Sequence, residues 1–138
     1  MIKILLLLIT LFSASLESIA QNTITATFEN IDHELGTVRV GLYKTEDSFL
    51  GKPYLALVSK IKNGKAEVIF KDIPDGVYAI SGFHDEDGNG KLNMVMGLIP
   101  SEPYGCSNNA PSRFGPPNWK DAKFEVKNGE VVQQKISL

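Results

Sequence analysis

Oxygen-bearing side chains recur at alternate positions in one short stretch, Asp85–Asn93, which reads DEDGNGKLN. Gly90 holds its sixth position, where a calcium loop needs a sharp turn, and the carbonyl of Lys91 falls at the seventh. Calcium takes roughly six to eight oxygen ligands at short range. The spacing therefore predicts a calcium site, whose candidate ligands are Asp85, Asp87, Asn89, the Lys91 carbonyl and Asn93.

The match to a helix-flanked calcium loop is incomplete. Met96 stands at the twelfth position, where a bidentate Glu is expected. A further oxygen must come from elsewhere, either from Glu102 or from a backbone carbonyl. The alternative is a hydrogen-bonded turn without an ion, because turns also prefer Asp, Asn and Gly. Zinc is not expected, since His84 is the one nearby nitrogen ligand and Cys106 is distant in sequence.

His84 and Cys106 are the other residues near this stretch that could do chemistry. His84 directly precedes Asp85, so it could transfer protons or, as the alternative, hydrogen-bond a neighbour and stiffen the loop. Cys106 is the only cysteine, which excludes an internal disulfide, and a lone thiol is commonly a small buried hydrophobe. None of the common nucleophile, phosphate-loop or zinc-protease motifs is present in the sequence. We therefore expect no catalytic residue.

Aromatic, amide and arginine residues gather between Tyr104 and Trp119. Such side chains suit the capture of carbohydrate or peptide by stacking and hydrogen bonding. The alternative is structural, with the aromatic rings pinning the segment to the fold. The candidate ligand-binding residues here and beside it are His84, Asn108, Asn109, Arg113, Phe114 and Trp119.

Seven short stretches are strand candidates: five alternate apolar and polar residues, as half-buried strands do, whereas 54–60 is mostly apolar and 77–84 is apolar on both sides, as in a central strand. They are residues 23–29, 37–43, 54–60, 65–71, 77–84, 122–127 and 132–138. Asn63-Gly64 and Asn128-Gly129 supply tight turns between them. This pattern predicts an all-β, antiparallel β-sandwich of the immunoglobulin-like or transthyretin-like kind, with one long loop, 85–121, between the penultimate strands. A small barrel is the alternative.

The N-terminal end and the composition indicate an exported protein. Lys3, the apolar run 4–12 and the small residues of Ser18-Ile19-Ala20 are typical of a cleaved signal peptide over residues 1–20, with an uncleaved anchor as the alternative. The remaining residues, 21–138, suit a single domain without a membrane span. The 138-residue chain carries 14 basic and 16 acidic residues, a formal charge of −2, which argues against a nucleic-acid partner. We expect a periplasmic or extracellular location.

Five segments in and beside the long loop have a distinctive sequence: Phe83–Leu92, Gly97–Pro100, Glu102–Gly105, Ser107–Ala110 and Arg113–Pro117. They resemble an exported bacterial family known as domain of unknown function 2141, and the resemblance covers nearly the whole chain after the signal peptide. It implies a transthyretin-like or carboxypeptidase-regulatory-like β-sandwich and supplies no reaction. Family members often carry an acid where Asn93 stands here.

Together these observations predict an exported, non-enzymatic β-sandwich module that binds a protein or polysaccharide at the cell envelope, or has a structural role there, with a calcium-braced loop. One alternative is a small envelope enzyme that uses His84 and loop carboxylates. Such an enzyme would place His84 in an open cleft beside a second titratable group, whereas a brace would leave it packed or hydrogen-bonded to backbone. The other alternative is a scaffold subunit that pairs through a strand edge.

Overall fold

The computed structural model describes residues 21–138, and the predicted signal peptide, residues 1–20, lies outside the described residues. The strands are β1 (Asn22–Glu29), β2 (Thr37–Tyr43), β3 (Leu55–Ser59), β4 (Ala66–Ile73), β5 (Gly76–Asp85), β6 (Met94–Val95), β7 (Ile99–Pro100), β8 (Tyr104–Cys106), β9 (Phe124–Val126) and β10 (Val131–Ser137). A 3-10 turn, η1 (Ser107–Asn109), and a single-turn helix, α1 (Trp119–Ala122), complete the described chain. Over this range no helix is both long and apolar enough to cross a membrane.

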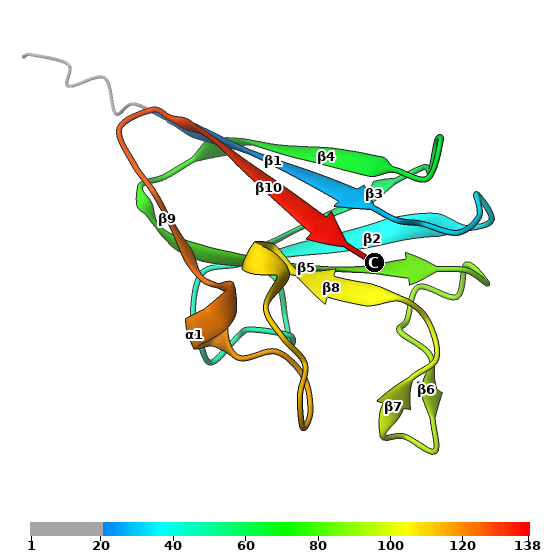
Figure 1. Ribbon diagram of the computed structural model, residues 1–138. Helices are drawn as coiled ribbons and strands as arrows, with labels where there is room; N and C mark the ends of the chain where they lie inside the picture. The colour runs from blue at the N-terminus through cyan, green and yellow to red at the C-terminus, as the bar shows by residue number, and fades with distance from the viewer. Residues whose placement is uncertain (1–20) are drawn as a thin grey trace, which may run out of the picture.

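The strands form two facing sheets, which confirms the predicted all-β sandwich (Figure 1). One sheet has the order β10-β1-β4, and the other has the order β3-β2-β5-β8, with β9 paired to β5. The pairs are antiparallel apart from β1 and β10, which run parallel. Alternation of residues along a strand does not specify the direction of its neighbour, so the sequence could not predict this parallel pair.

The core lies between the two sheets and follows the alternation of the sequence. In β1, buried positions alternate with partly exposed ones, and Phe28 is fully buried. Gly82 of β5 lies directly beneath its ring, because a Cβ on Gly82 would stand 2.4 Å from the Phe28 ring. The glycine therefore leaves the space that a large aromatic side chain of the opposite sheet fills.

The predicted long loop, 85–121, contains structure of its own. Its strands β6 and β7 form a small hairpin that projects from the sandwich, and β8 extends the larger sheet beside β5 (Figure 1). Ser107 ties this segment to the sheet, since its hydroxyl donates to the Ala122 carbonyl at 2.6 Å and accepts from the Ile80 N–H at 2.9 Å. The predicted strand 122–127 is shorter than expected, because the end of α1 occupies Ala122.

Candidate metal loop and apolar groove

Strand β5 delivers Asp85 to its C-terminal end, where the side chain is fully buried. Arg39 of the neighbouring strand β2 donates from Nε to Asp85 Oδ2 at 2.7 Å, and the Gly90 N–H donates to the same oxygen at 2.9 Å. Burial by itself raises the pKa of the Asp85 carboxyl. Hydrogen bonds from Arg39 and Gly90, a contact with Asp87 and the Arg39 charge together outweigh burial and hold the pKa below its usual value. Asp85 is therefore ionised at neutral pH.

The second oxygen of Asp85 is unusual. Oδ1 is buried and has no hydrogen-bond partner among residues 21–138. Carboxylate oxygens of Asp87 and Glu102 gather around Asp85, with the three ligand atoms within 4.8 Å of one another. Glu102 is itself buried, with 5% of its surface exposed. One guanidinium does not neutralise three clustered carboxylates, so the cluster keeps excess negative charge beside an unsatisfied oxygen.

Glu102 closes the loop that the sequence singled out. The Glu86 N–H donates to Glu102 Oε1 at 3.1 Å, and the Asn93 N–H donates to Oε2 at 3.0 Å. The chain around Glu102 is held against β5, because the His84 N–H donates to the Pro103 carbonyl at 2.9 Å. Of the two sources that the sequence left open for a further oxygen, the fold thus brings Glu102 to the loop.

The side-chain amide of Asn93 hydrogen-bonds to these carboxylates, and that of Asn89 hydrogen-bonds to Asn93. Asn93 Nδ2 donates to Asp87 Oδ2 at 2.7 Å and to Glu102 Oε1 at 3.4 Å. Asn89 Nδ2 donates to Asn93 Oδ1, and the Lys91 N–H donates to Asn89 Oδ1 at 2.9 Å. The Asn93 amide thus links two carboxylates, as a cation does. A half-turn of that amide exchanges Nδ2 for Oδ1 and converts a donor into a metal ligand.

His84 is buried at the end of β5, with 1% of its surface exposed. Its Nε2–H donates to the Leu35 carbonyl at 2.5 Å. Gly36, at φ +74°, permits this contact, because a Cβ there would stand 2.0 Å from the Asp85 carbonyl oxygen. A buried ring bonded to backbone favours the bracing role over an open catalytic cleft.

The candidate ligand-binding residues of the second half of the loop are mostly engaged in structural contacts. Asn108 Nδ2 donates to the Asp121 and Lys123 carbonyls at 3.1 and 2.9 Å. Asn109 Oδ1 accepts from the Ser137 N–H at 2.9 Å. The Trp119 ring meets the Phe49 ring edge-on, with centroids 5.8 Å apart. These contacts favour the structural alternative for the three residues.

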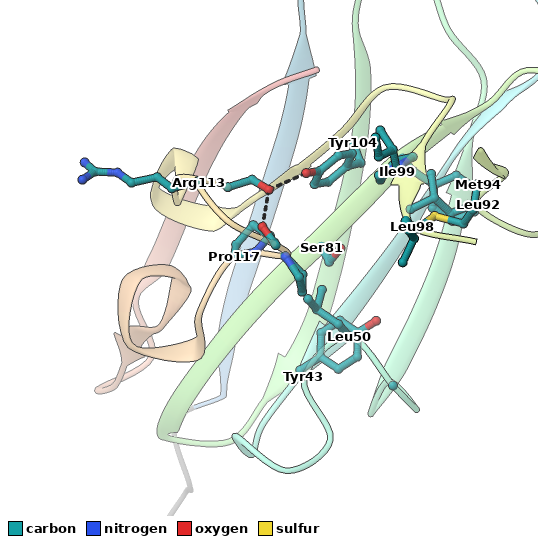
Figure 2. Close-up of a pocket in the computed structure, with 16 residues that line it drawn as sticks. Tyr43, Leu50, Ser81, Leu92, Met94, Leu98, Ile99, Tyr104, Arg113 and Pro117 are labelled. Atoms are coloured by element: carbon teal, nitrogen blue, oxygen red, sulfur yellow. Dashed lines mark hydrogen bonds between the residues drawn. The ribbon is translucent and has the colours of Figure 1, made fainter. Parts of the chain in front are cut away.

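Arg113 and Phe114 lie apart from those structural contacts. Phe114 is fully exposed. The guanidinium of Arg113 is directed away from the cluster of apolar side chains on the other side of the view (Figure 2). Arg113 also lines the groove between the β6–β7 hairpin and the segment that follows η1, whereas Phe114 does not, and their predicted role in ligand binding stays a prediction.

An apolar groove of about 590 Å³ lies between the β6–β7 hairpin and the segment that follows η1. Its apolar wall is made chiefly by Leu50, Phe83, Leu92, Met94, Leu98 and Ile99 (Figure 2). Its polar edge carries the Tyr104 hydroxyl, which shares a 2.6 Å hydrogen bond with Ser112 Oγ. The volume falls in the range of ligand pockets. The sequence signal for this groove was the apolar run 92–100 inside an otherwise polar loop.

Cys106 belongs to the packing of this region. It is 1% exposed and forms a small cluster with Ala79 and Ala122, against which Phe49 and Trp119 pack. Burial raises the pKa of its thiol to about 11, although a hydrogen bond with Ser81 works in the opposite direction. The thiol is therefore neutral at physiological pH, which is unsuitable for a nucleophile.

Comparison with known proteins leads to one family. No curated protein matches the chain, and no solved structure matches it either. A family model described as an uncharacterised protein conserved in bacteria, DUF2141, matches residues 26–134. The matched range includes the metal loop, the β6–β7 hairpin and both walls of the groove. The chain therefore belongs to this bacterial DUF2141 family.

Proposed function

We propose that this protein is an exported, non-enzymatic module that binds a protein partner in its apolar groove at the cell envelope, and that Ca²⁺ braces the loop 85–102 beside the groove. One observation carries the proposal. Asp85 is buried, its carboxylate clusters with those of Asp87 and Glu102, and its Oδ1 has no hydrogen-bond partner among the described residues. A buried charged oxygen without a hydrogen-bond partner lowers the stability of the folded protein, and a bound cation would remove that penalty.

The chemistry of the donor set fits calcium. Asp85, Asp87 and Glu102 would hold the ion, with the Asn89 and Asn93 amide oxygens and the Lys91 carbonyl as further donors. All are hard oxygen ligands, which suit calcium and give little affinity for softer metals. Bound calcium would supply the positive charge that holds the three carboxylates together.

The loop and the groove are joined directly, which is why a brace in one affects the other. Asn93 links Asp87 and Glu102, and its neighbours Leu92 and Met94 form part of the groove wall. At the base of the hairpin, the Ser101 N–H donates to the Asn93 carbonyl at 2.8 Å. Ordering of Asn93 therefore orders both strands of the hairpin where they leave the loop.

The apolar character of the groove and its rim supports a protein partner over a polysaccharide. The hairpin exposes Met96 and Leu98, at 90% and 79%, next to the groove. Contiguous exposed apolar surface marks sites of protein contact. His84 is buried and bonded to backbone and Cys106 is buried and neutral, which supports the non-enzymatic part of the proposal.

The exposed strand β3 favours a second candidate, the scaffold subunit. It forms an edge of the larger sheet, and four of its five side chains are exposed, including Leu55 and Val58. An exposed apolar edge can accept a strand from another chain. Under this reading, Val58→Lys abolishes assembly measured by light scattering. A wild-type protein that stays monomeric at high concentration contradicts self-pairing through this edge.

Thermal melting of the purified protein tests calcium bracing. Free Ca²⁺ at about 100 times Kd stabilises the native state by about 2.7 kcal/mol. For a domain of this size that corresponds to a rise in Tm of about 10 °C over the chelated sample. Asp87→Asn should lose the rise, whereas Asp47→Asn, an exposed position outside the loop, should keep it. An unchanged Tm at millimolar Ca²⁺ contradicts calcium bracing.

A fluorescent apolar probe, anilinonaphthalene sulfonate, tests the groove separately. We expect its fluorescence to fall several-fold in Leu98→Asp, which places a charge on the groove wall. Phe114→Asp is the matched control, because Phe114 is fully exposed and does not line the groove. Equal fluorescence in the two variants contradicts binding in the groove, whatever the calcium result.

A further inference from the structure

We propose that His33, His84 and Glu86 form a second metal site, specific for a divalent transition metal such as Zn²⁺ rather than for calcium. The three side chains offer two imidazole nitrogens and a carboxylate oxygen, all within 4.8 Å of one another. They lie beside the acidic loop but share no side chain with the Asp85, Asp87 and Glu102 cluster. The site therefore goes beyond the calcium-braced module.

The spacing of the donor atoms is close to what zinc needs. His33 Nε2 lies 3.7 Å from Glu86 Oε2, and His84 Nδ1 lies 4.0 Å from Glu86 Oε1. Zinc binds nitrogen and oxygen at about 2.0–2.2 Å, so tetrahedral ligand atoms stand roughly 3.3–3.6 Å apart. Each histidine–Glu86 distance therefore needs to shorten by less than about 1 Å, which the side chains of His33 and Glu86, both more than a third exposed, can supply.

The buried histidine is already oriented for binding. Because His84 Nε2–H donates to the Leu35 carbonyl, the neutral ring carries its lone pair on Nδ1, the nitrogen on the side of Glu86. Metal-ligating histidines characteristically donate their other ring N–H to a carbonyl or carboxylate, which fixes the tautomer and the ring orientation. Gly36, the residue after Leu35, packs against the Asp85 backbone without room for a Cβ, so the chain at Leu35 lies close to the end of β5. The outer contact of the site is thus built into the fold.

The second histidine comes from the loop between β1 and β2. The His33 ring lies against His84, with centroids 4.8 Å apart. His33 Nδ1 accepts a 3.3 Å hydrogen bond from the Leu35 N–H, and binding through Nε2 requires the ring proton to move to Nδ1. The Leu35 N–H then loses the His33 ring as its acceptor. Because this hydrogen bond is exposed, a water molecule can accept from the N–H instead.

The choice of metal follows from the donors. Imidazole nitrogen is a poor ligand for calcium, whereas two histidines with one carboxylate are typical of zinc and related ions. Three protein ligands leave a coordination position open, and the partial exposure of His33 and Glu86 places it toward solvent. The site thus suits capture of a transition-metal ion at the surface of an exported protein.

Titration of the purified protein with Zn²⁺ by calorimetry, and with Co²⁺ by visible absorption, tests the site. Millimolar Ca²⁺ is kept present so that the acidic loop does not compete. We expect one equivalent of Zn²⁺ to bind, with at least a tenfold loss of affinity in His33→Ala and in Glu86→Gln. Both variants change partly exposed side chains, so they should fold, whereas buried His84 is left intact.

Two control variants make the outcome specific. Asp32→Asn, an exposed neighbour of His33, and Asp87→Asn of the acidic loop should both keep wild-type zinc affinity. Conversely, His33→Ala should leave the calcium-dependent rise in Tm unchanged, which separates this site from the calcium loop. Absence of Zn²⁺ binding, or equal binding by His33→Ala and the wild-type protein, would overturn the proposal, and the latter would mark the binding as adventitious.

Discussion

Replacement of Asn93 by Asp should have opposite effects on the metal loop, lowering the stability of the metal-free protein and raising its affinity for calcium. The perturbation exchanges a single amide nitrogen for an oxygen and adds one negative charge. In the metal-free protein it removes the 2.7 Å hydrogen bond from Asn93 to Asp87 and the longer one to Glu102. It also places a fourth carboxylate among the three that already cluster there. The metal-free loop should therefore become less stable.

The size of the effect follows from these contacts. A hydrogen bond to a charged group contributes roughly 1.5–3 kcal/mol, and the exposure of the Asp87 bond reduces this to about 1–2 kcal/mol. The corresponding fall in Tm is about 4–8 °C for the chelated variant. With calcium bound, the added carboxylate becomes a charged ligand, and affinity rises with ligand charge. A tenfold gain in affinity adds about 1.4 kcal/mol to the calcium stabilisation.

The assay is thermal melting of Asn93→Asp and wild-type protein, each in excess chelator and in Ca²⁺. We expect the variant to melt below wild type in chelator and to show the larger calcium-dependent rise. Lys91→Ala is the matched control, because only its backbone is assigned to the site. A variant that melts like wild type in chelator refutes the linking role of Asn93. A variant that loses stability in chelator and gains none with Ca²⁺ refutes the metal.

Four further predictions concern the scaffold that holds the loop. Cys106 should not react with Ellman's reagent at pH 8 until the protein unfolds, because burial raises the pKa of its thiol to about 11. The stability that this neutral thiol contributes is complete below about pH 9 and should be lost as the pH rises toward 11, as denaturant titrations can measure. Gly82→Ala should lower the free energy of unfolding by about 1–3 kcal/mol, as denaturant titration measures, because its Cβ would stand 2.4 Å from the Phe28 ring. Ser107→Ala should cost about 2–3 kcal/mol in the same assay, since it leaves the Ile80 N–H and the Ala122 carbonyl without their partner. A thiol that reacts in the native state, or variants as stable as wild type, would contradict these expectations.

The strands and the position of the acidic loop could be predicted from local pattern. Alternation over residues 23–29 placed β1, because a strand with one face in the core repeats every two residues. Asn63-Gly64 marked a turn because both residues adopt positive φ, at 53° and 72°. The pattern of oxygen-bearing residues in 85–93 was also local, because the spacing of those residues and the turn at Gly90 lie within one short continuous segment.

Contacts between segments far apart in the chain could be decided only by the tertiary structure. Arg39 reaches Asp85 because β2 and β5 pair in a register that aligns their ends, across 46 residues of sequence. His33 meets His84 because Gly36 lets the β1–β2 loop pack against the end of β5. The sequence therefore determined which residues carry oxygen or nitrogen ligands and which strands present them. Strand pairing and loop packing, which depend on the whole core, decided which of those ligands share a site.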